Sequence, residues 1–162
     1  MNSMLYIPPQ IIAYVRDALH SVIGQAAERI ANVADWSREE QCPVWYVEHL
    51  ERLERVFALL EVLGWSEADC SSAIRIDLCE HRWALLKALE VLALDAQDDL
   101  DELDLGIKLS RTARLRRGGD ALRRAFELRD FGSAAIVQVA LLDAEEHRRQ
   151  RWSNPSKAEG SR

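Results

Sequence analysis

Apolar and polar residues alternate along most of this chain with the period of an α-helix. Behind Pro8–Pro9, apolar residues recur at every third or fourth position as far as Val33, which is the spacing of one helix face. Proline suits a first helical turn because the N–H that it lacks has no partner there. The pattern predicts a helix over about 9–34, with a face made of Ile12, Val15, Leu19, Val22, Ala26, Ile30 and Val33.

A second stripe of the same kind begins after a polar connector over 36–42. Pro43 opens it, and Gly64 stands where a left-handed residue ends a helix. The sequence therefore predicts a helix between these two residues, with Leu53 and Phe57 in the core. The full stripe comprises Tyr46, Leu50, Leu53, Phe57 and Leu60, widened by Val56 and Leu63.

The middle of the chain carries a short extended segment and a third helix. Ala73–Ile76 alternates apolar with polar residues, which favours a strand. Asp77 and Glu80 then have the spacing of a capping box, in which each side chain binds an N–H of the first helical turn. An apolar face continues to Leu103, so we expect a helix over about 78–103.

Glycines divide the last third of the chain. Gly106 and Gly118–Gly119 predict breaks, with a short helix over about 120–130 and a final helix from Ser133 to about Trp152. Residues 153–162 have almost nothing to bury and are expected to form a disordered tail. Residues 1–152 are then one helical domain.

Composition agrees with a globular fold. The chain has 162 residues, of which 48% are hydrophobic and 30% charged, values typical of one globular domain. It lacks both an apolar run of 18 residues and a cationic, signal-like start, and its three cysteines are an odd number. The sequence predicts a cytoplasmic, all-α, single-domain bundle of four to five helices, mostly up-and-down.

Histidines and cysteines are the first candidate chemical groups. His20, His49, His81 and His147 fall one to each predicted helix and border its apolar face. Facing helices could combine them into a metal site, but the Glu-x-x-His pair of di-iron bundles is absent. Cys42, Cys70 and Cys79 show no zinc-site spacing. We interpret the histidines as boundary residues and the thiols as buried or half-buried, and predict neither a metal nor a cofactor.

Arg75 and His81 resemble the Arg-x(4–6)-His pair of HEPN-type ribonucleases, which are also small helical bundles. That resemblance implies a histidine that activates a ribose hydroxyl beside a guanidinium that binds phosphate. However, Ile76 stands where those enzymes carry a polar residue, and chance also produces such a pair in an arginine-rich chain.

Two tracts of opposite charge follow one another. Residues 95–104 carry six acids and no base, while residues 108–129 carry eight bases and two acids. Three interpretations remain open: the tracts neutralise each other, the basic tract meets a protein partner, or it binds nucleic-acid phosphates. The candidate contacts are Lys108, Arg111, Arg114, Arg116, Arg117, Arg123 and Arg124.

The signatures of phosphate loops, serine nucleophiles and zinc proteases are missing from the sequence. We therefore expect a small non-enzymatic protein that acts by protein–protein interaction or self-association. A nucleic-acid-binding protein that uses 108–129 is the first alternative. A helical-bundle enzyme is the second, either ribonuclease-like at Arg75 and His81 or metal-dependent at the histidines.

Overall fold

The computed structural model describes the backbone of residues 3–35, 43–65, 72–104 and 111–153, and their side chains apart from 32–35, 43–47, 96–104, 111–119 and 121–122. This part of the chain forms four helices and two short strands. In chain order they are β1 (Met4–Ile7), α1 (Pro9–Asp35), α2 (Pro43–Leu63), β2 (Ile74–Asp77), α3 (Leu78–Asp104) and α4 (Arg111–Ser153). The predicted all-α bundle is confirmed. The predicted connector over 36–42 and most of the predicted tail lie outside the described residues.

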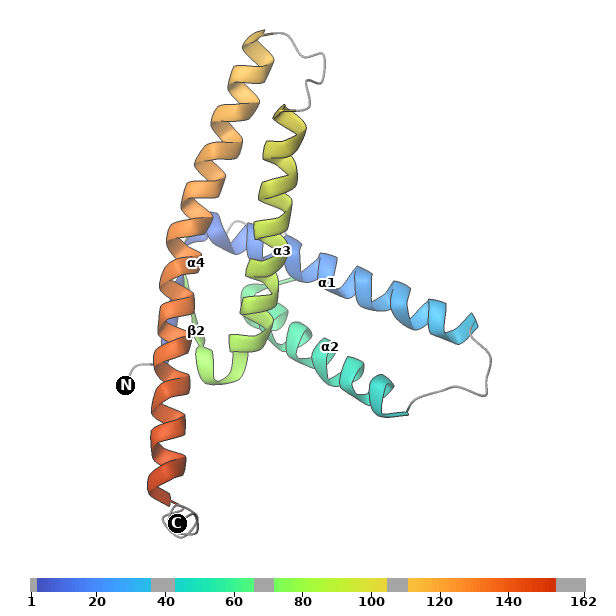
Figure 1. The fold of residues 1–162 in the computed structure, drawn as a ribbon, viewed down its shortest axis with the longest axis vertical. Helices are drawn as coiled ribbons and strands as arrows, with labels where there is room; N and C mark the ends of the chain where they lie inside the picture. The colour runs from blue at the N-terminus through green and yellow to red at the C-terminus, as the bar shows by residue number, and fades with distance from the viewer. Residues whose placement is uncertain (1–2, 36–42, 66–71, 105–110, 154–162) are drawn as a thin grey trace, which may run out of the picture.

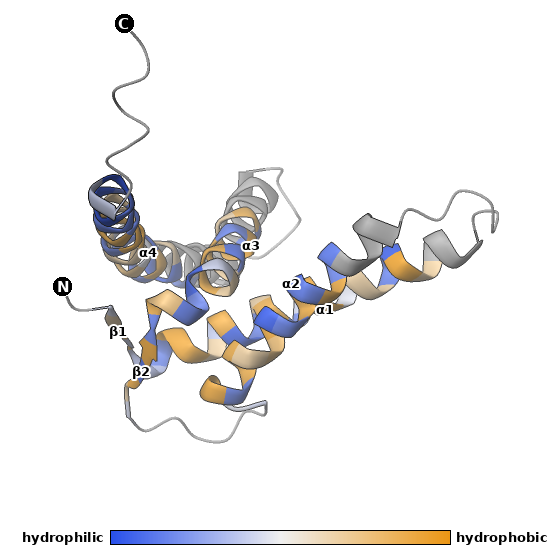
Figure 2. Cartoon of the chain, turned by 90° about the horizontal axis from the view of Figure 1, so that it is seen from below, coloured by the Kyte–Doolittle hydropathy of each residue, from blue (hydrophilic) through white to orange (hydrophobic). Residues whose placement is uncertain are grey.

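The helices form two antiparallel hairpins that cross each other (Figure 1). α1 and α2 form one arm, and α3 and the long α4 form the other. α3 is the central helix because it contacts each of the other three. Figure 2 shows the two arms from below, with many apolar residues where α1 and α2 meet the strands. No helix in the described ranges has a stretch long and apolar enough to cross a membrane.

The core lies where the two arms cross. The first half of the α1 face is buried as predicted, and residues from every other element complete the cluster. Its members include Ile7, Ile11, Ile12, Val15 and Leu19, then Val56, Leu59, Leu60 and Leu63, and finally Ile76, Leu78, Leu85, Leu128, Ala135, Val139 and Leu142.

A two-stranded antiparallel sheet fastens the start of the chain to the start of α3. Leu5 pairs with Ile76 and Ile7 with Ile74, so that Leu5, Ile7 and Ile76 are buried. The extended segment predicted before Asp77 is confirmed, whereas β1 was not predicted. The Leu78 N–H also donates to the Ser3 carbonyl at 2.8 Å.

The helix boundaries follow the predicted signals. Gly64 has a φ of +83°, the left-handed conformation expected after the end of α2. Asp77 Oδ1 accepts the Cys79 N–H at 2.9 Å and caps α3, and this hydrogen bond lowers the pKa of the Asp77 carboxyl. Glu80, the other member of the predicted capping box, instead has its carboxylate 3.7 Å from His81 Nε2.

The predicted break in the last third of the chain is wrong, because α4 is one helix from Arg111 to Ser153 that includes Gly118–Gly119. A glycine costs only about 1 kcal/mol in a helix, and packing outweighs such a cost. Gly132 is buried against α3, where a Cβ atom would lie 3.9 Å from Leu89 Cδ2. This glycine therefore lies at the contact between α3 and α4 and does not end a helix.

The predicted core face of α2 is partly wrong. Leu50 and Phe57 are 40% and 37% exposed, while Val56 and Leu60 are fully buried. The Phe57 ring packs instead against Trp65, with ring centroids 5.6 Å apart. Apolar residues occur on two sides of this helix, and the buried side includes a histidine, His49. The periodicity of the sequence therefore predicted a buried face that is rotated toward Leu50 and Phe57 relative to the face that is buried in the structure.

Candidate functional site

The four histidines lie one to each helix, as predicted, but the structure does not bring them together. His49 and His81 are buried, at 7% exposure each, whereas His20 and His147 are exposed. His147 Nδ1 lies 2.8 Å from the Asp143 carbonyl of its own helix. Within the described residues, no group of three histidine, cysteine or carboxylate side chains could hold a metal ion.

Arg75 and His81 occupy different environments. Arg75 is exposed on β2 opposite Tyr6, and His81 is buried in the first turns of α3. The open hollow next to His81 is lined by Glu51, Glu54, Arg55, Ala58, Glu80 and His81. Arg75 is not among these residues, and the three glutamates would repel a phosphate. The geometry therefore gives the ribonuclease-like alternative no support.

The single cysteine with a described side chain is exposed, which contradicts the predicted buried or half-buried thiol. Cys79 is the second residue of α3, and it points away from the core while Leu78 beside it is fully buried. Cys42 and Cys70 lie outside the described residues.

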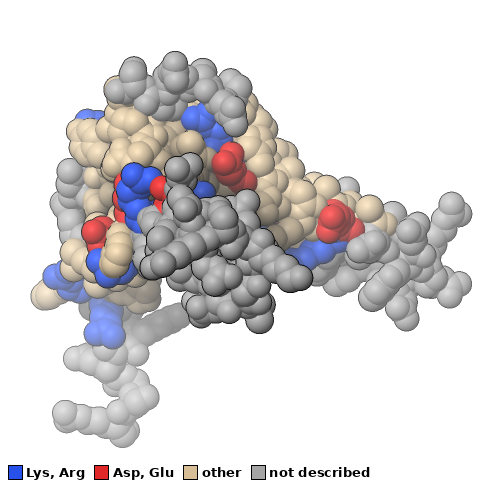
Figure 3. All heavy atoms as spheres, turned by 90° about the horizontal axis from the view of Figure 1, so that it is seen from above, with Lys and Arg blue, Asp and Glu red and all other residues tan. Residues whose placement is uncertain are grey.

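The described part of the arginine-rich segment is already engaged within the chain. Arg123 forms an ion pair with Asp120, and the Arg124 guanidinium lies 5.3 Å from the centre of the Tyr14 ring. Arg129 pairs with Asp130 at 3.0 Å. Figure 3 shows the described charged side chains from above, with no continuous basic area among those visible.

The other predicted contacts fall outside the described side chains. Arg111, Arg114, Arg116 and Arg117 belong to the first turns of α4, for which only the backbone is described, and Lys108 precedes that helix. The acidic tract 95–104 forms the end of α3, which runs antiparallel to α4 (Figure 1). The arrangement is compatible with mutual neutralisation of the two tracts, but the acidic and basic side chains involved are not described.

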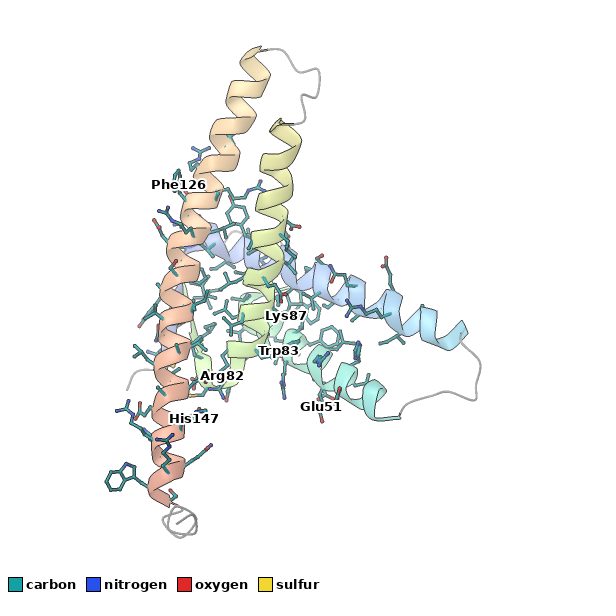
Figure 4. The ribbon with its side chains drawn as sticks, in the orientation of Figure 1. Glu51, Arg82, Trp83, Lys87, Phe126 and His147 are labelled. Atoms are coloured by element: carbon teal, nitrogen blue, oxygen red, sulfur yellow. The ribbon has the colours of Figure 1, made fainter. Side chains whose placement is uncertain are left out.

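Arg82 fixes the orientation of α4 on α3 (Figure 4). Its Nη1 donates to Asp143 Oδ1 at 2.8 Å, and its Nη2 donates to Glu146 Oε2 at 3.2 Å. The hydrogen bond to Glu146 is the main reason why the pKa of Arg82 is raised. This pair of contacts places the side of α4 that carries Asp143 and Glu146 toward α3.

The opposite side of α4 is apolar and exposed. Phe126, Val137 and Leu141 are 52%, 59% and 52% exposed. Ile136, which is 54% exposed, lies on another side of the helix, where it lines a groove between α3 and α4. Phe126 lies on the side of α4 away from α3 (Figure 4). We call this surface the outer face of α4, and it consists of Phe126, Ser133, Val137, Ala140, Leu141 and Ala144.

Most of the outer face lies within a segment of α4 that has no charged residue. Residues 133–142 read Ser-Ala-Ala-Ile-Val-Gln-Val-Ala-Leu-Leu, without a charged residue on any side. A helix that is apolar all round is typical of a buried position. Here Ala135, Val139 and Leu142 are buried, so the fold of one chain covers only one side of the segment.

Sequence reasoning missed this surface, although the uncharged run was a signal for it. The sequence predicts a final helix from Ser133 to about Trp152, and the spacing of its apolar residues alone does not show how many of its sides are apolar. Ser133 and Val137 lie seven and eleven positions after Phe126, and all three residues are exposed on the same side of the helix. This spacing indicates a second face beside the buried one.

Comparison with known proteins gives no match to this chain among protein-family models, curated proteins or solved structures.

Proposed function

We propose that this protein is a non-enzymatic helical protein that acts by protein–protein interaction, with the outer face of α4 as its contact surface and a second copy of the chain as the occupant. The observation that carries the proposal is the uncharged segment 133–142, which exposes Val137 and Leu141 opposite its buried side. The hydrophobic effect favours covering such a face.

The size of the outer face suits a dimer interface. Its three large side chains, Phe126, Val137 and Leu141, are each a little over half exposed. They present on the order of 300 Å² if a side chain of this size has roughly 200 Å² of surface. A standard interface takes about 800 Å² from each partner, and about 56–65% of that area is apolar. Flanking alanines and charged residues would contribute the rest.

The charge pattern around Val137 favours a second copy in antiparallel orientation. Suppose that two antiparallel α4 helices cross at Val137. A residue near the contact line that lies a given number of positions before Val137 in one copy then faces the residue that lies the same number of positions after Val137 in the other copy. Asp130, seven residues before Val137, then faces Ala144, seven residues after it, so that no like charges meet there. Phe126 likewise faces Arg148, an arrangement that allows a guanidinium to lie over an aromatic ring.

A parallel pair would be less favourable. It would place Asp130 against Asp130 and Arg148 against Arg148, and like charges in contact are destabilising. In the antiparallel pair, Arg129 and Glu145 keep their partners within the chain, Asp130 and Arg149. Small residues at 133, 134, 140 and 144 allow the two helices to approach closely.

Light scattering behind a sizing column tests the proposal at tens of micromolar protein. We expect the wild type to be a dimer and the Val137→Lys variant to be a monomer. The circular dichroism spectrum of the variant should stay helical, because Val137 is not part of the core. Val62→Lys is the matched control, since Val62 is an exposed valine at 42% exposure on α2. A monomeric wild type, or a dimeric Val137→Lys variant, would overturn the proposal.

A further inference from the structure

A second concave site lies on the other arm of the molecule. A cavity of about 410 Å³, partly open to solvent, lies between α1, α2 and α3, and none of the described side chains of α4 lines it. Ligand pockets for small molecules have volumes of roughly 300–1,000 Å³, so the cavity is large enough for one.

The inner wall of this cavity is apolar. Val22 of α1, Leu53 and Val56 of α2, and Val91 of α3 all line it. Val56 is fully buried, and Leu53, Val22 and Val91 are half-buried. The Trp83 ring is also part of the lining, and the Arg55 guanidinium lies 5.9 Å from the centre of that ring.

The charged lining is positive in a chain that is negative as a whole. Arg29, Arg52 and Lys87 supply three positive charges against the two carboxylates of Glu90 and Asp95, whereas the chain has a formal net charge of −6. Lys87 already pairs with Glu90. Arg29 and Arg52 have no carboxylate partner within the described part of the chain, which leaves two guanidinium groups from facing helices available to an anion.

The two arginines lie toward the same end of the cavity. Arg29 follows Val22 along α1 in the direction of the 36–42 connection, and Arg52 precedes Val56 along α2 on the side of the same connection. Because α1 and α2 run antiparallel (Figure 1), both arginines lie farther along this arm from the crossing of the two arms than Val22 and Val56 do. Figure 4 shows Trp83 and Lys87 on the side of α3 that faces this arm.

We propose that this cavity binds a small amphipathic carboxylate. Arg29 and Arg52 hold the carboxylate head group, and the apolar body lies against Leu53, Val56 and Val91. A guanidinium binds a carboxylate through charge-assisted hydrogen bonds, which are stronger than neutral ones. The site is independent of the outer face of α4, so the function proposed above and this inference succeed or fail separately.

Octanoate is the probe, and octanol is its uncharged control. Binding is measured by isothermal titration calorimetry and by methyl NMR shifts of Val22, Val56 and Val91. We expect octanoate to bind with one-to-one stoichiometry and octanol to bind at least tenfold more weakly. Arg29→Gln and Arg52→Gln should each weaken octanoate binding by about tenfold, the usual effect of one lost hydrogen bond to a charged group. Arg75→Gln, which removes an exposed arginine outside the cavity, should leave the affinity unchanged.

Two further variants report on the cavity itself. Asp95→Asn removes a carboxylate from the lining and should strengthen octanoate binding. Ala26→Trp places a large ring in the cavity and should abolish binding while the circular dichroism spectrum stays helical. Octanol binding as tight as octanoate binding, wild-type affinity in both arginine variants, or no binding of octanoate at millimolar concentration would each overturn the inference.

Discussion

The Arg82 guanidinium of α3 donates a 2.8 Å hydrogen bond to Asp143 Oδ1 of α4, although the two residues are 61 positions apart in the sequence. Leu142, beside Asp143, is buried, whereas Leu141 is 52% exposed. The contact therefore lies beside the buried side of α4. Together with the buried Ala135, Val139 and Leu142, it marks which side of segment 133–142 packs on α3, and the opposite side becomes the outer face.

Removal of this contact should destabilise the fold modestly. Both side chains are partly exposed, at 32% for Arg82 and 49% for Asp143, so solvent screens their attraction. We expect a coupling energy of about 1 kcal/mol from a double-mutant cycle of Arg82→Met and Asp143→Asn, measured by urea unfolding. Strictly additive single-variant effects would show that the contact does not hold the two helices together.

Two neighbouring apolar residues of α2 should respond very differently to truncation. Leu60 is fully buried, so Leu60→Ala should cost about 2–5 kcal/mol of unfolding free energy. Phe57 is 37% exposed and packs mainly on Trp65, so Phe57→Ala should cost only about 1–2 kcal/mol. Urea unfolding of the two variants gives the comparison, and a larger loss for Phe57→Ala would contradict the observed rotation of α2.

Local signals in the sequence were sufficient to place most helix ends. Pro9, Pro43, Gly64 and Asp77 each act within one turn of the backbone, and each marks a boundary in the structure. Properties that depend on distant residues were not predictable in this way. β1 forms because Leu5 pairs with Ile76, and periodicity within a single segment contains no information about such a partner.

The same distinction explains the failures on α2 and α4. The buried side of α2 includes His49, a polar residue that broke the apolar pattern and moved the predicted face toward Phe57. On α4, the low helix propensity of Gly118–Gly119 predicted a break, but the helix continues through both glycines. The predicted helix end before Ser133 is also absent, and Gly132 there packs against α3. The uncharged run that contains the outer face can be seen in the sequence. Which side of that run is exposed depends on contacts with another helix, α3, including the contact with Arg82.

The cap of α3 should give the protein a defined acid sensitivity. The Cys79 N–H lowers the pKa of Asp77 below the ordinary value for aspartate, which is about 3.9. The carboxylate therefore contributes its full stabilisation above pH 4, and this contribution is lost as the pH falls through the lowered pKa.

Comparison of Asp77→Ala with the wild type in urea at several pH values measures this effect. At pH 7 the variant should lose about 1 kcal/mol of stability, the usual cost of a lost N-cap. The difference should shrink as the pH falls below about 4, because the wild-type carboxyl is then protonated. A difference that stays constant down to pH 2 would show that the charge of Asp77 plays no part in the cap.

Two glycines should respond in opposite directions to replacement by alanine. Gly24 lies inside α1, and a Cβ atom there would have no heavy atom within 4 Å, so Gly24→Ala should stabilise the fold by about 0.5–1 kcal/mol. Gly64 has a φ of +83°, so Gly64→Ala should destabilise it by about 1–2 kcal/mol. Thermal unfolding measures both, and a stabilised Gly64→Ala variant would contradict the left-handed end of α2.

The central claim is that two copies of α4 pack antiparallel through their outer faces, and disulfide cross-linking tests it most directly. Phe126→Cys and Arg148→Cys are made separately in a background that carries Cys42→Ser, Cys70→Ser and Cys79→Ser, and the two proteins are then mixed and oxidised. Residues that face each other come within the short Cα–Cα distance that a disulfide requires. We predict that the mixed disulfide between the two variants exceeds either symmetric product and any product of a Val62→Cys control. Cross-linking no greater than that control, or a dominant symmetric product of the Phe126→Cys variant, would contradict the claim.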